Sequence, residues 1–163
     1  MNTHVFFPIN LTLTQHRLQP NGLRVLSLIP GLIEQIPGKS PDRMIHCSSL
    51  GGKEDILLDL DVSPQSVQEM FGFPLIGVRR AEFQKLLIDT AEKHGIEIRW
   101  GHQAIEFTQS EDAVHVTFAN GAKDTASFVV GCDGLHSNTR TALFGKEKAD
   151  YTGLVQVRLG WWW

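Results

Sequence analysis

The stretch Phe128 to Arg140, FVVGCDGLHSNTR, combines an apolar run, two glycines and one carboxylate. The run Phe128–Val130, continued by Cys132 past a glycine, suits a buried strand. The pattern therefore places Asp133 at the carboxyl end of a strand, where α/β sheets present ligand sites. Two glycines would let the backbone approach a ligand closely or adopt a positive φ, namely Gly131 and Gly134.

The spacing alone leaves two interpretations of this carboxylate open. Asp133 could bind a polar ligand, or it could cap the helix that the polar segment Ser137–Arg140 is expected to open. The glycines could likewise make only a tight turn, because short turns of glycine and aspartate are common.

The same stretch resembles the aspartate-glycine motif of the class A flavoprotein monooxygenases, the FAD-dependent aromatic hydroxylases related to salicylate hydroxylase. The chain matches this motif at Gly131, Cys132, Asp133, Gly134, Ser137 and Arg140. The resemblance implies that Asp133 and Gly134 contact the cofactor. In the family, the aspartate lies near the FAD pyrophosphate and is implicated in both flavin and NAD(P)H binding.

Arg80 to His94 has the clearest helical pattern in the chain. Phe83, Leu86, Leu87 and Ala91 form one apolar stripe that is expected to face the core, and Gly95 is placed to end the helix in the left-handed conformation.

Arg80 would lie in the first turn of this helix, where the helix dipole opposes a cation and an anionic partner is expected. The partner could be Glu82 or Asp89 in an ion pair, or a ligand. The resembled family places an arginine that contacts FAD at the start of such a helix. This implies that Arg80 binds the cofactor, with Arg79 as the alternative.

The segments before this helix predict smaller elements. Residues 1–14 favour an edge or broken strand, and residues 20–36 favour two short helices separated at Pro30-Gly31. A surface loop or short hairpin is expected over 37–55 and a strand over 56–60. Residues 61–77 are mostly polar, and no element is predicted there.

After Gly95, alternating apolar residues predict strands near 96–100, 105–107 and 114–118, the last ending at the hairpin signal Asn120-Gly121. With the resemblance, this order predicts an α/β fold: a partial FAD-binding domain, Rossmann-like and of the glutathione-reductase type, with a β-meander. Residues 1–158 would form this domain, including part of the substrate-domain crossover.

The glycine-rich turn that holds the FAD pyrophosphate in this family is absent, since residues 1–20 contain no glycine. We therefore expect the chain to lack the N-terminal βαβ unit and to be an incomplete part of a longer flavoprotein. Residues 159–163 form an atypical tail, in which Trp161–Trp163 would make an aggregation or interaction patch.

Composition excludes several other classes of protein. A net charge of −3 with scattered Lys and Arg gives no electrostatic case for nucleic acid. Cys47 and Cys132 are too few for a disulfide framework or a metal site, and the seven histidines show no paired ligand spacing. Without a signal peptide or an apolar run long enough to span a membrane, the expected location is the cytoplasm.

The resemblance implies a monooxygenase in which NAD(P)H reduces FAD, and the flavin reacts with O2 to form a C4a-hydroperoxide that hydroxylates a small, aromatic substrate. No catalytic acid or base is predicted from these residues. The alternatives are a related FAD-dependent reductase or dehydrogenase, and a non-catalytic flavoprotein fragment.

Overall fold

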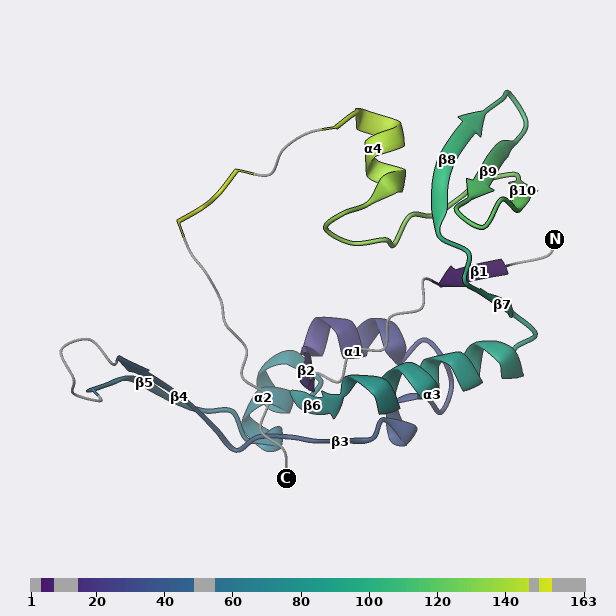
Figure 1. Cartoon of the computed structure of the whole chain (residues 1–163). Coiled ribbons are helices and arrows are strands. Elements are labelled where there is room, and N and C mark those ends of the chain that lie inside the picture. The colour runs from purple at the N-terminus through teal and green to yellow at the C-terminus, as the bar shows by residue number, and fades with distance from the viewer. Residues whose placement is uncertain (1–3, 8–14, 49–54, 147–149, 154–163) are drawn as a thin grey trace. The chain divides into compact units, whose positions relative to one another are not determined.

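The structure is a computed structural model that describes residues 4–7, 15–48, 55–146 and 150–153. It divides into two compact units, shown in Figure 1, and each is described by itself. The helical unit takes in the described residues of Leu11–His94, and the meander unit those of Met1–Asn10 and Gly95–Leu159.

The helical unit combines short helices with a small antiparallel sheet. Its elements are β2 (Gln15–Leu18), α1 (Pro20–Leu26), the 3-10 helix η1 (Ile33–Gln35), β3 (Gly38–Lys39), β4 (Arg43–Ser48), β5 (Asp55–Asp61), α2 (Pro64–Phe71), β6 (Ile76–Arg79) and α3 (Arg80–Lys93). Strand β6 lies between β2 and β3 and is antiparallel to both. Because α3 follows β6 without a loop, this sheet fixes where the first turn of α3 begins.

Leu23 in α1 and Leu32 before η1 are the most deeply buried side chains of this unit, at 0% and 1% exposure. Pro20 occupies the first turn of α1, where its missing N–H costs nothing. The chain then leaves the helix before Pro30-Gly31 and forms η1 beyond it. The prediction of two short helices separated at this point is confirmed.

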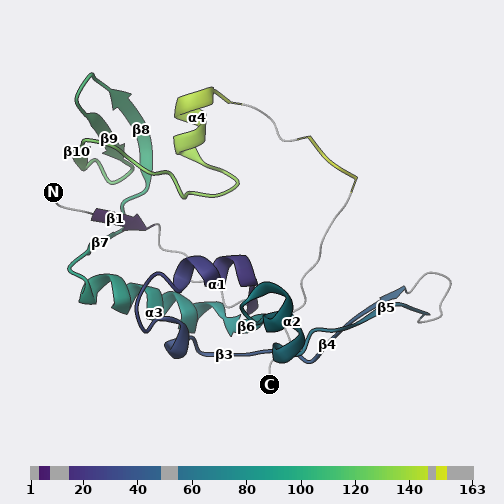
Figure 2. The same ribbon diagram turned by 180° about the vertical axis from the view of Figure 1, so that it is seen from behind.

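Strands β4 and β5 form the hairpin expected between residues 37 and 60, and both views show it extending away from the rest of the helical unit (Figures 1 and 2). Leu57 and Ile56 are more than 60% exposed on it. The next segment contains a helix that the sequence analysis missed, α2, which starts after Ser63 with Pro64 in its first turn and ends at Gly72 in the left-handed conformation. The start and stop signals were present in the sequence, but the polar composition of the segment obscured them.

Helix α3 confirms the predicted helix, and Gly95 after it has the expected positive φ of 74°. The apolar stripe is only partly covered, since Phe83, Leu86 and Leu87 are half-buried and none of the side chains of α3 is fully buried.

The meander unit contains a parallel strand pair, a three-stranded antiparallel sheet and one helix. Its elements are β1 (His4–Phe7), β7 (Glu97–Trp100), β8 (Ala104–Gln109), β9 (Val114–Phe118), β10 (Lys123–Ala126) and α4 (Asn138–Phe144). Strands β1 and β7 are parallel, and β8, β9 and β10 form the expected β-meander. The unit is therefore mixed α/β, as predicted.

The Asn120-Gly121 signal makes the predicted turn between β9 and β10. The Phe118 carbonyl accepts a hydrogen bond from Gly121 N–H, and Phe118 N–H donates to the Ala122 carbonyl. Gly121 has a φ of 83°, while Asn120 keeps a negative φ, so only the glycine takes the left-handed conformation. This is the turn in which a glycine bulge closes a three-residue loop.

We expect Leu23→Ala to lower the free energy of unfolding by about 2–5 kcal/mol, because it leaves a cavity in the core of the helical unit. Urea unfolding followed by circular dichroism measures this. Leu28→Ala is the matched control, since Leu28 is 79% exposed and should lose about 0.5 kcal/mol or less. Equal losses in the two variants would contradict the assigned core.

Candidate functional site

The apolar run before the aspartate does not form the buried strand that its sequence predicts. Phe128 is 67% exposed and Val130 71%, and no described strand pairs with this extended segment. Cys132, expected to continue this buried strand, is also exposed. An apolar run becomes a buried strand only where neighbouring backbone and a covering layer are present, and the described part of this unit supplies neither. Asp133 therefore lies at the end of an extended segment instead of a strand tip.

The two glycines of the motif do what their positions predict. Gly134 has a φ of 76°, in the left-handed region that favours glycine. Gly131 passes close to the first turn of α4, since a Cβ built on it would lie 2.5 Å from Thr139 Cβ. A Cβ on Gly134 would meet no heavy atom within 4 Å, so one flank of this turn is open.

Asp133 accepts hydrogen bonds from the start of helix α4 with both carboxylate oxygens, and Oδ2 caps it. Its Oδ1 accepts a hydrogen bond of 2.5 Å from Ser137 Oγ. Its Oδ2 accepts from the Thr139 backbone N–H at 3.0 Å and from Thr139 Oγ1 at 3.2 Å. Of the two interpretations left open by the sequence, helix capping is the one that the structure shows. A cofactor contact from the Asp133–Gly134 turn stays a prediction.

These contacts lower the pKa of Asp133 to about 2. Partial burial alone would raise this pKa, but hydrogen bonds from the Ser137 hydroxyl, the Thr139 backbone, the backbone of Asp133 itself and the Thr139 hydroxyl together outweigh it. The Asp133 side chain is therefore ionised and acceptor-only at neutral pH.

Ser137 and Asn138 make further hydrogen bonds that hold the motif in place. The sequence analysis gave neither of them a role in the site. Ser137, only 7% exposed, is the N-cap of α4 and accepts a hydrogen bond of 2.8 Å from Arg140 N–H. Asn138 Nδ2 donates to the Ala104 carbonyl of β8 at 2.7 Å. The signal for Ser137 lay in the sequence, since serine is a preferred N-cap residue. The partner of Asn138 is 34 residues away, and no local pattern identifies it.

Arg80 is the first residue of α3, as predicted, and belongs to the helical unit. The ion pair considered for it is wrong. Glu82 pairs with Arg79 at 3.0 Å, and Asp89 pairs with Lys85 at 2.7 Å. The exposed Arg80 side chain makes no hydrogen bond or ion pair with any described residue.

The first turn of α3 is also uncapped, because the N-cap residue Arg79 makes no side-chain cap hydrogen bond. The unsatisfied N–H groups of a helix N-terminus attract anions, and an unpaired arginine adds a full positive charge beside them. The structure thus brings Asp133 and Gly134 together in one turn and places Arg80 at a separate helix start.

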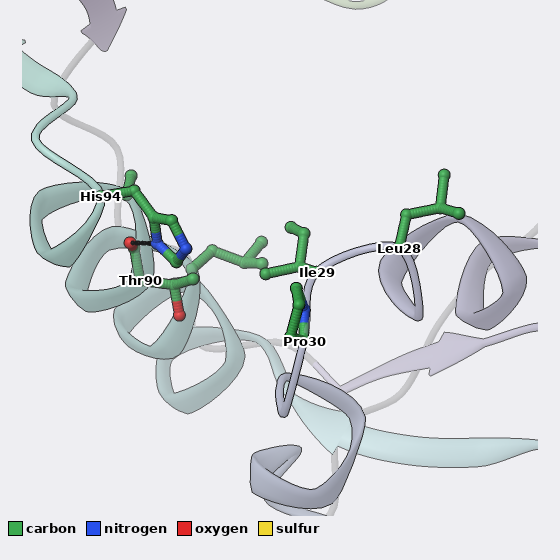
Figure 3. Close-up of a pocket in the computed structure, with 7 residues that line it drawn as sticks. Leu28, Ile29, Pro30, Thr90 and His94 are labelled. Carbon is green, nitrogen blue, oxygen red and sulfur yellow. Dashed lines mark hydrogen bonds between the residues drawn. The ribbon is translucent and has the colours of Figure 1, made fainter.

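A shallow apolar groove of about 320 Å³ lies along the C-terminal half of α3 (Figure 3). Ile29 and Pro30 face Thr90 and His94 across it, and His94 Nδ1 lies 2.8 Å from the Thr90 carbonyl. Arg80 lies at the other end of the helix, about 10 Å from Leu87, the nearest residue of α3 that lines the groove, at 1.5 Å of rise per residue. The groove is therefore separate from Arg80.

Other kinds of site find no support among the described residues. They contain no group of three His, Cys, Asp or Glu side chains that could hold a metal ion. Cys47 and Cys132 are both free thiols. Within the described ranges, no helix has the length and hydrophobicity of a membrane span.

Comparison with protein families gives one matching model, described as an FAD binding domain, over residues 37–159. This range contains Arg80, Asp133 and Gly134. The chain is also 27% identical over 144 residues to 3-hydroxybenzoate 6-hydroxylase 1 of Aquipseudomonas alcaligenes, a match that covers 87% of this chain and 36% of that protein. It is 27% identical over 143 residues to 6-hydroxynicotinate 3-monooxygenase of Bordetella bronchiseptica, with coverage of 86% and 36%.

Among solved structures, the chain resembles Klebsiella pneumoniae HpxO, which was crystallised with FAD and uric acid. The TM-score is 0.66 at 21% identity, over 84% of this chain and 34% of the other. This likeness shows a shared fold. The chain spans about a third of the length of the relatives that it matches. It belongs to the family of FAD binding domains, and its homologues are class A flavoprotein monooxygenases of the aromatic-hydroxylase type.

Proposed function

We propose that this chain supplies cofactor contacts in an NAD(P)H-dependent FAD monooxygenase that hydroxylates a small, aromatic substrate with O2. The observation that carries the proposal is the match to an FAD binding domain over residues 37–159, which include Arg80 and the Asp133–Gly134 turn. Two of the relatives are named as hydroxylase and monooxygenase of aromatic compounds, which supports the same reaction class.

Arg80 fits an anionic group such as the pyrophosphate of FAD. Its guanidinium is exposed and makes no hydrogen bond or ion pair with a described residue, and the helix that it starts has an uncapped first turn. An arginine and free backbone N–H groups at one helix start provide both a charge and several donors for phosphate oxygens.

The Asp133–Gly134 turn would let a planar or extended ligand come close to its backbone. Gly134 carries no side chain, its conformation favours glycine, and the space beside it holds no heavy atom within 4 Å of a Cβ. A backbone surface of this kind lets a cofactor pack directly against peptide groups.

When bound, FAD supplies the redox chemistry, taking electrons from NAD(P)H and passing them to O2. This chain binds and orients the cofactor. The only strongly perturbed carboxyl beside the motif, Asp133, is ionised and bonded to α4, so it is placed as an acceptor and not as a proton donor to a substrate.

The roles proposed for the described residues are cofactor contacts, and they include no acid–base pair for a substrate. A second function is therefore compatible with the same residues. A related FAD-dependent reductase or dehydrogenase, or a fragment that holds flavin without turnover, would use the same contacts. Titrating the chain with FAD and following flavin fluorescence tests the contacts common to all of them. Oxygen uptake that increases with an aromatic substrate would then support the monooxygenase, and flavin reduction without substrate-dependent oxygen uptake would support the reductase.

We expect Arg80→Ala to weaken FAD binding by roughly tenfold or more, because it removes a charge-assisted hydrogen bond to the pyrophosphate. The fluorescence titration measures the change. Arg79→Ala is the matched control, since this adjacent arginine is engaged with Glu82. A larger loss in Arg79→Ala than in Arg80→Ala would reverse the assignment.

We expect Gly134→Val to abolish most flavin binding, because a β-branched side chain resists a φ of 76° and fills the open flank of the turn. Gly121→Val is the strain-matched control in the same unit, with a φ of 83° and equally open space. Normal flavin content in Gly134→Val, or the same loss in both variants, would refute a specific role for the turn.

A further inference from the structure

The Asp133 carboxylate is hydrogen-bonded within its own chain. Three of its roughly four lone-pair positions accept hydrogen bonds from Ser137 and Thr139, at the start of α4. Little of the side chain's bonding capacity remains for a ligand. The residues of the turn from Gly131 to His136, by contrast, are exposed.

The two hydrogen-bond partners of Ser137 Oγ fix the direction of its hydroxyl proton. A hydroxyl carries one proton, and Ser137 Oγ has two partners within hydrogen-bond distance. Because the Arg140 backbone N–H can only donate, Ser137 Oγ must accept from it. The hydroxyl proton is then left for Asp133 Oδ1, 2.5 Å away. Ser137 is 7% exposed, so water does not readily take over either contact.

We propose that Ser137 is a positioning residue of the flavin site: it holds the Asp133 carboxylate against α4, so that Asp133 shapes the turn and the backbone around Gly134 meets the cofactor. This inference rests on the proposed function. It assigns Asp133 an indirect role and gives Ser137 a role in binding that its buried position does not suggest.

The surrounding contacts give the turn a fixed base. Arg140 Nη2 donates to the Leu135 carbonyl at 2.6 Å, which ties the far side of the turn to α4. Asn138 ties α4 to the Ala104 carbonyl of β8. The Arg140 guanidinium is engaged with a carbonyl, and among the described residues the side-chain donors to Asp133 are the hydroxyls of Ser137 and Thr139. The low pKa of Asp133 agrees with this arrangement.

An NMR pH titration of the Asp133 carboxyl carbon in the full chain tests the first step. We expect Ser137→Ala to raise the pKa of Asp133 toward the ordinary value of an aspartate, and Ser137→Thr to keep it low because threonine retains the hydroxyl. Thr141→Val is the matched control, since it removes a hydroxyl of the same helix that bonds to the Ser137 carbonyl and not to Asp133. An unchanged pKa in Ser137→Ala would overturn the proposal.

Flavin affinity tests the second step. We expect Ser137→Ala to bind FAD about tenfold more weakly, and Ser137→Thr to bind it nearly as the unchanged chain does. If Ser137→Ala does not fold, Thr139→Val replaces it, with a smaller rise in pKa because only the 3.2 Å hydrogen bond is lost. A raised pKa with unchanged affinity would refute the positioning role.

The failure of this inference can be told apart from the failure of the proposed function. If the unchanged chain does not bind FAD, the proposed function is contradicted. The titration of Asp133 still reports whether Ser137 holds the carboxylate, because that measurement needs no cofactor.

Discussion

The hydrogen bonds between Asp133, Ser137 and Thr139 are the constraint on which the candidate site depends. They connect an extended segment that has no described strand partner to the first turn of α4, and Asn138 in turn connects α4 to β8. Without them, the hydrogen bond from Arg140 Nη2 to the Leu135 carbonyl would be the described side-chain contact left between the turn and α4. Gly131 also helps to connect the segment to α4, because the absence of a side chain lets the segment pass within contact of Thr139.

The two helix starts that the sequence singled out differ in a way that matters for function. At α4, the Asp133 carboxylate and the Ser137 hydroxyl satisfy the N–H groups of Thr139 and Arg140. At α3, no side chain caps the first turn, and Arg80 has no partner among the described residues. A helix start whose N–H groups are capped by side chains gives a rigid turn. A helix start without a side-chain cap, and with an arginine that has no described partner, suits an anion. This contrast supports different roles for the two residues in the proposed function: Asp133 holds its own turn in place, and Arg80 suits an anionic ligand.

The features that depend on short-range forces could be predicted from local sequence patterns. The helix from Arg80, the turn at Asn120-Gly121 and the positive φ of Gly134 follow from short-range periodicity and backbone sterics, and all three are confirmed. The run Phe128–Val130 was predicted wrongly, because its burial depends on neighbouring layers that the sequence pattern presumes. The spacing in fact favours Arg79 over Arg80 as the partner of Glu82, because residues three apart on a helix are neighbours and residues two apart are not.

The most direct measurement of the central claim is a titration of the isotope-labelled chain with FAD, followed through its backbone amide signals. The account predicts saturable shifts concentrated at Gly131 to His136 and at Arg80. It also predicts that the amides of the β4–β5 hairpin and of the groove beside His94 stay unchanged. Saturable binding that leaves the turn and Arg80 unshifted would contradict the account.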